Sequence, residues 1–234
     1  MVLLVGLLCF GLGYFVAPSK PESMPPVPEP RQEDIAVENF IQRIQQKAQA
    51  QPEDGLALQQ QLKNQKAQVN SVIESATPEQ INKYLEQSFP GYDLSNIQNK
   101  HVFAKRLVSE FVDAKNDPNE VLAGKATVST QQQYSAGGVL PRQIYAGQQL
   151  FAHFDTLGKV PNNEQVFVRW SNQSTGEVLF FMPQRVSVNR EQNWVSFNPV
   201  NGWKAGTYDV KYYQLNDQLN PIAQTSFKID QVID

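Results

Sequence analysis

A change to period-two patterning from Lys125 onward is the feature that most constrains this chain. A run such as VFVRW at 166–170 sends every second side chain to the same face of a strand. Polar turns separate the runs, so the pattern predicts about seven or eight short strands, as is typical of a two-layer β-sandwich. The expected strands cover residues 126–129, 150–154, 166–170, 176–181, 186–188, 194–197, 208–215 and 225–229.

The stretch KAGTYDVKYY at 204–213 suggests which residues would hold the two sheets of such a sandwich together. Tyr208 begins a late strand, Val210 follows two residues later, and Trp170 lies on an earlier strand. In these features residues 125–230 resemble a bacterial immunoglobulin-like domain without its disulfide. The resemblance implies that Tyr208 hydrogen-bonds to the backbone upstream and that Val210 and Trp170 are structural core residues. It also implies binding or scaffolding more than catalysis.

The first 19 residues, MVLLVGLLCFGLGYFVAPS, contain no charged side chain. A membrane-spanning helix needs about 20 apolar residues, so we expect residues 1–19 to be an uncleaved transmembrane signal anchor. A cleaved signal peptide is an alternative, but the basic leading region is absent and Phe15 is bulky for a cleavage site. A lipid anchor at Cys9 is another, although Leu8 precedes it where a small residue is expected. A start site placed too far downstream would also explain the missing basic region.

Residues 20–32 are expected to form a proline-rich linker. The stretch 18–30, PSKPESMPPVPEP, contains six prolines and favours extended polyproline II structure over a packed core. A ligand for an SH3-type domain is the alternative. Lysine and arginine are sparse after the apolar segment, so we expect an inner-membrane protein whose C-terminal part lies in the periplasm.

Residues 33–116 are expected to form a helical segment. Apolar residues recur at spacings of three and four over 37–48, 58–73, 81–89 and 97–111. Thr77-Pro78-Glu79-Gln80 reads as a capping box, and the last helix is expected from Ser95 to Asp113. A solvated helical hairpin and a partner-binding coiled coil both remain open, and His101 is expected to be a core residue.

Composition excludes several functions. The 234 residues carry a net charge of −3 and are 18% charged, so no basic surface for nucleic acid is expected. One cysteine and two histidines allow no intrachain disulfide and favour no metal site or cofactor. His153 and Asp155 share a strand face that we expect to be exposed to solvent. No motif serine accompanies them, so we expect no enzyme.

Four aromatic residues are candidates for partner binding: Phe167, Trp194, Trp203 and Tyr213. Strand alternation turns Phe167 and Trp194 away from the sandwich core and Tyr213 opposite Tyr212, while Trp203 lies in a loop. Exposed aromatic rings could anchor a protein partner or stack on sugar rings. The alternative is that a second layer, such as the helical segment, covers them.

Together these expectations describe an α+β multidomain protein with an N-terminal transmembrane helix, a short helical segment and a C-terminal immunoglobulin-like β-sandwich over residues 125–231. The expected function is non-enzymatic: a membrane-anchored adaptor or structural subunit that binds other envelope proteins. The alternative is a glycan- or peptidoglycan-binding module that uses the exposed aromatic residues.

Overall fold

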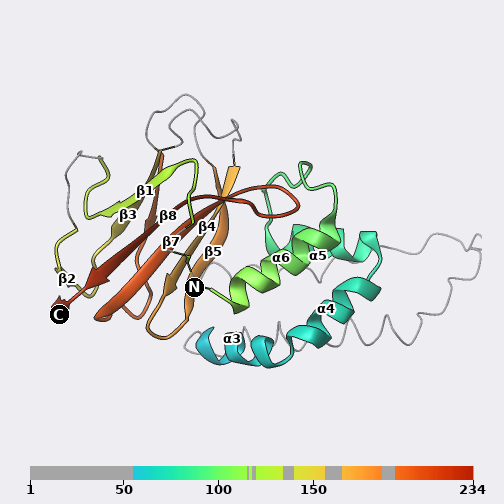
Figure 1. Cartoon of the computed structure of the whole chain (residues 1–234), viewed down its shortest axis with the longest axis horizontal. Helices are drawn as coiled ribbons and strands as arrows, with labels where there is room; N and C mark the ends of the chain where they lie inside the picture. Colours follow the sequence, from blue (N-terminus) through green and yellow to red (C-terminus); the bar gives the residue numbers. More distant parts are fainter. Residues whose placement is uncertain are drawn as a thin grey trace, which may run out of the picture.

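The computed structural model describes residues 55–114, 116–117, 120–133, 140–155, 165–185 and 193–233. These form a mixed α+β structure in which helices come first and mostly antiparallel strands follow (Figure 1). The expected anchor 1–19, the linker 20–32, the helix over 37–48 and the strand 186–188 lie outside the described residues. No described helix is long and apolar enough to cross a membrane.

The described helices follow their local sequence signals. The predicted capping box is present, because Gln80 N donates to Thr77 Oγ1 and Thr77 N donates to Gln80 Oε1. The last helix begins five residues later than predicted, since the Asn99 side chain accepts from Val102 N and caps it there. The stripe over 58–73 is divided between two helices. The bounds are α3 Gly55–Asn64, α4 Lys66–Ser75, α5 Pro78–Ser88 and α6 Lys100–Val112.

One antiparallel sheet contains four strands in the order β5-β4-β7-β8. Their bounds are β4 Gln165–Asn172, β5 Val178–Arg185, β7 Gly206–Gln214 and β8 Pro221–Ile229. Strand β5 starts later than predicted and continues through Pro183, which is tolerated because β5 is an edge strand.

A second sheet contains three antiparallel strands in the order β1-β3-β6. Their bounds are β1 Lys125–Ser129, β3 Leu150–Asp155 and β6 Asn193–Phe197. Two further strands, β2 Gln143–Tyr145 and β9 Gln231–Ile233, form a separate parallel pair. Each of the two has only three residues, too few for alternation to predict them.

The space between the two sheets is the main core. Trp170, Tyr208 and Val210 are buried there, 0%, 2% and 0% exposed. The Tyr208 hydroxyl donates to Lys204 O at 2.7 Å, which is the backbone contact expected from the sequence. Burial raises the pKa of this hydroxyl above its usual value, so it stays protonated and keeps donating.

A second core lies on the outer face of the four-stranded sheet, where the helices pack (Figure 1). Phe167 of β4 contacts Phe89 after α5 and Phe103 of α6, with ring centroids 5.2 and 6.0 Å apart. Phe181 and Tyr213 join the same cluster. The described chain therefore has three layers: helices, the four-stranded sheet and the three-stranded sheet.

Candidate functional site

Two of the four aromatic candidates, Phe167 and Tyr213, are covered. Both point away from the space between the sheets, as alternation predicted, but each is 0% exposed. The expectation that they lie on the surface was wrong, because α5 and α6 pack over them. The alternative stated from the sequence, a covering helical layer, is the arrangement found.

Trp203 is also buried, at 3% exposed, although it lies in a loop as expected. Its ring packs 5.2 Å from Tyr208 and 5.9 Å from Trp170, and its Nε1 donates to Gln148 O at 2.6 Å. The loop closes one end of the core with this indole. The expectation of an exposed Trp203 was therefore wrong, since a loop residue can face the core as readily as a strand residue.

Trp194 is the remaining candidate, and it is 38% exposed. It lies on the outer face of the three-stranded sheet, where its ring meets the half-buried Phe151 edge to face at 5.4 Å. We call this surface the open face and define it by the outward residues of two cross-strand rows. The rows are Thr127, His153 and Trp194, and Ser129, Phe151 and Ser196.

His153 lies on the open face but is only 4% exposed, so the expectation of a solvent-facing side chain was wrong. Its Nε2 is 3.0 Å from Ser129 Oγ and 3.0 Å from Gln131 O, so the turn after β1 covers it. Burial lowers the pKa of His153, which favours neutral imidazole at neutral pH. The Ser129 hydroxyl also accepts from Gln131 N. These contacts close the turn after β1.

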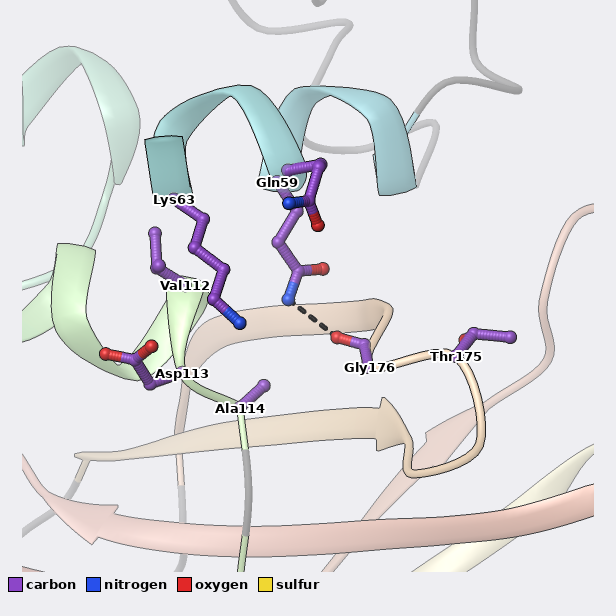
Figure 2. Close-up of a pocket in the computed structure, with 8 residues that line it drawn as sticks. Gln59, Lys63, Val112, Asp113, Ala114, Thr175 and Gly176 are labelled. Atoms are coloured by element: carbon purple, nitrogen blue, oxygen red, sulfur yellow. Dashed lines mark hydrogen bonds between the residues drawn. The ribbon is translucent and has the colours of Figure 1, made fainter. Parts of the chain in front are cut away.

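A pocket of about 200 Å³ lies between α3, the end of α6 and the turn that joins β4 to β5 (Figure 2). Gln59 fixes its wall, because its amide donates to Gly176 O at 2.6 Å and accepts from Val178 N at 3.0 Å. Sites for small molecules are usually about 300–1,000 Å³, so the pocket is small for a substrate or cofactor. It is lined by Gln59, Gln60, Lys63, Val112, Asp113, Ala114, Thr175 and Gly176.

Two charged residues that line the pocket are Lys63 and Asp113. Asp113 is bound by Lys66 at 2.6 Å, while the Lys63 side chain extends from α3 into the space above Ala114 (Figure 2). Among the described residues, no group of three histidine, cysteine or carboxylate side chains could hold a metal ion.

A buried charge network joins the helical layer to the four-stranded sheet. Glu110 of α6 binds Arg169 of β4 at 2.6 Å and accepts from the Tyr213 hydroxyl at 2.5 Å. Its second oxygen binds Arg106 at 2.8 Å. Burial raises the pKa of the Tyr213 hydroxyl well above its usual value, so that hydroxyl remains a donor. Both carboxylate oxygens are engaged, and the network holds α6 in place.

No protein-family model matches the chain, and no curated protein matches it. Among solved structures, the alkylpurine DNA glycosylase AlkC of Pseudomonas fluorescens, bound to DNA containing an abasic site analog, aligns at 12% identity and a TM-score of 0.27. The alignment covers 80% of this chain and 55% of that chain, so this chain spans about half of its length. A likeness at this level carries no argument about function.

Proposed function

We propose that this protein is a non-enzymatic, membrane-anchored envelope protein. It serves as an adaptor or structural subunit of a membrane-associated complex, and its β-sandwich binds a protein partner through the open face. The observation that carries the proposal is the position of Trp194. It is 38% exposed beside Phe151, whereas Phe167, Trp203 and Tyr213 are at most 3% exposed.

The strand order supports the immunoglobulin-like part of the proposal. In such a domain, strands β1, β3, β4, β5, β6, β7 and β8 would be strands A, B, C, C′, E, F and G. The two sheets then read A-B-E and C′-C-F-G. The contact of Tyr208 with Lys204 O corresponds to the tyrosine corner of such domains. Domains of this architecture serve many roles, so the role must come from the surface.

The chemistry of the open face fits a protein interface. Its centre carries hydroxyl groups and two aromatic rings, and the charged residues Lys125 and Asp155 form the next row, at its edge. Interface cores are depleted of charge and enriched in aromatic residues, and tryptophan is over-represented among the residues that dominate binding energy. A partner that covers Trp194 and Phe151 would bury both rings.

The anchor and linker supply the membrane part of the proposal. Residues 1–19 would hold the chain in the inner membrane. The proline-rich stretch after them would extend roughly 40 Å if fully polyproline II. The open face would then meet its partner in the periplasm, beyond the membrane surface.

A glycan or peptidoglycan ligand is the second candidate. One observation favours it, because the Ser196 hydroxyl lies two residues from Trp194 on the same face of β6 and could hydrogen-bond a sugar while the indole stacks on it. The burial of Phe167, Trp203 and Tyr213 removes them from both candidates. A protein partner is preferred because Trp194 packs edge to face on Phe151, and adjacent aromatic rings suit the core of a protein interface.

Crosslinking in native membranes tests the proposal. A photo-crosslinking amino acid at Ser196, in the full chain, should give a protein adduct that Trp194→Ala removes. The matched control is Val200→Ala, which alters a 60% exposed apolar residue outside the open face and should leave the adduct intact. An adduct that survives Trp194→Ala equally well would reject the open face. Retention on peptidoglycan that depends on Trp194, without any protein adduct, would favour the glycan candidate.

A further inference from the structure

Beyond the helical layer, the chain after α6 crosses the outer face of β4, β7 and β8 through polar contacts. Arg169 Nη2 donates to Asn116 Oδ1 at 3.1 Å, and Lys211 binds Glu120 at 2.8 Å. Gln224 Nε2 donates to Asp117 O at 2.5 Å. We call this contact region the polar seam and define it by Asn116, Arg169, Ser171, Asp209 and Gln224.

The polar seam contains several buried atoms that have no hydrogen-bond partner among the described residues. Ser171 and Asp209 are both 0% exposed, and their free atoms are Oγ and Oδ2. Buried polar atoms in native proteins nearly always have a partner, either protein or ordered water. The unpartnered atoms of the seam are Asn116 Nδ2, Arg169 Nε, Ser171 Oγ, Asp209 Oδ2 and Gln224 Oε1.

Strand register places Ser171 and Asp209 directly opposite each other on β4 and β7. Such pairs have Cβ atoms about 5 Å apart, so one small molecule that lies between the two side chains can touch both. The two side chains do not bond to each other. A molecule between them must donate to the carboxylate oxygen and exchange a hydrogen bond with the hydroxyl.

The surrounding charges limit what that molecule can be. Arg169 and Lys211 occupy the neighbouring row of the same two strands, so a metal cation would be repelled from both. An anion would be repelled by Asp209, whose other oxygen already accepts from Gln173 and Ser226 at 2.5 Å each. A neutral molecule that both donates and accepts satisfies Ser171 Oγ and Asp209 Oδ2 together.

We propose that the polar seam binds an ordered internal water that bridges Ser171 Oγ and Asp209 Oδ2. Globular proteins hold about one buried water per 27 residues, typically with about three hydrogen bonds, so such a site is ordinary in number and geometry. This water links the side chains of β4 and β7 at this position. It is independent of the open face and of any partner.

The pocket and the seam involve neighbouring residues of the chain. Gln59 lines the pocket and bonds to Val178 N, and Val178 is the register partner of Ser171. Ala114, another lining residue, lies two positions before Asn116. These neighbours place the pocket near the seam, although none of the seam residues lines it.

A crystal structure of the protein at a resolution that shows ordered solvent tests the site directly. The expected result is a water peak within hydrogen-bond distance of Ser171 Oγ and Asp209 Oδ2. The proposal is overturned if no peak is present, or if the two side chains bond to each other. It is also overturned if the peak has several oxygen ligands at about 2.3–2.6 Å, as a calcium ion would.

Thermal unfolding of Ser171→Ala gives a second, independent readout. If water bridges the hydroxyl, its removal leaves Asp209 short of a partner and should lower the melting temperature by about 3 °C. If the hydroxyl has no partner, its removal should leave the melting temperature unchanged or raise it, and the proposal fails. Ser196→Ala, on the open face, is the matched control and should shift the melting temperature by about 1 °C or less.

Discussion

The outer faces of the two sheets have the same kind of alternation and opposite surroundings. On the four-stranded sheet, Phe167 and Tyr213 lie under α5 and α6. On the three-stranded sheet, Phe151 and Trp194 lie edge to face, and Trp194 reaches solvent. An outward aromatic residue on a strand is therefore no evidence of a binding surface until the next layer is known.

Charge placement separates the two faces as clearly as ring burial does. The covered face holds Arg169, 0% exposed, and provides it with Glu110 from the helical layer. The open face has no such group at its centre, where the buried polar residue is His153 and its partner is a local turn. A buried ion pair needs a permanent cover, whereas a face of hydroxyls and rings can remain exposed or accept a partner.

Truncating one aromatic ring on each outer face tests most directly whether the covered face contributes more to stability than the open face. Phe167→Ala removes a side chain that contacts three other aromatic rings, so it should cost about 4 kcal/mol of the free energy of unfolding. Phe151→Ala, on the open face, should cost about 1 kcal/mol. Urea unfolding of the purified protein measures both. Equal losses would show that the helical layer contributes little to stability.

The charge network provides the next largest effect. Glu110→Ala leaves Arg169 buried and unpaired, so it should cost about 3 kcal/mol in the same measurement. The matched control is Glu74→Ala, which breaks a largely exposed pair with Lys105 and should cost about 0.5 kcal/mol. Replacing both partners, as in Glu110→Leu with Arg169→Met, should recover part of the loss. A double variant as unstable as Glu110→Ala would contradict this account.

The next prediction concerns a hydrogen bond at the edge of the core between the two sheets. Its loss should lower the free energy of unfolding less than the two changes above. Tyr208→Phe removes the hydrogen bond to Lys204 O and should cost about 1 kcal/mol. Tyr145→Phe, at a 60% exposed tyrosine, should change stability by less than about 0.5 kcal/mol. If Tyr208→Phe is as mild as its control, the tyrosine corner does not stabilise this sandwich.

The smallest expected effect is a pH dependence that originates on the open face. Burial lowers the pKa of His153 below the unfolded value of about 6.5, so the unfolded chain takes up the proton more readily. The stabilisation from neutral His153 is complete above that value and is lost as the pH falls through the folded pKa. The melting temperature should therefore fall less between about pH 7.5 and pH 5 in His153→Gln than in the native protein. Identical slopes would place His153 in a more solvated site.

Local signals in the sequence predicted local structure well. The capping box at Thr77 and the alternation over Val166–Trp170 depend on neighbours within a few residues, and both appear as predicted. The start of α6 was predicted five residues too early, at Ser95. The helix begins after Asn99, whose side chain accepts from Val102 N and caps it. Helices, antiparallel strands and the inward side of each strand were therefore predictable.

Long-range contacts were not predictable from one sequence. Glu110 and Arg169 are separated by 59 positions, and nothing in either segment indicates that they meet. The burial of Trp203 depends on a loop conformation, and the cover over His153 depends on the turn after β1. Of the four aromatic candidates, Trp194 alone is exposed. The sequence indicates which side of a strand a residue faces, but it does not show which other segments pack over that side.

The amide of Gln59 has a mechanical consequence. It holds Gly176 O and Val178 N at the same time, so it joins α3 to the edge strand β5 by two bonds that must break together. A pulling force on the chain ahead of Gly55 reaches α3 first and is transmitted to the sheet through the two hydrogen bonds of Gln59. If residues 1–19 do anchor the protein, tension between membrane and partner would be resisted by the sandwich as well as by the helices.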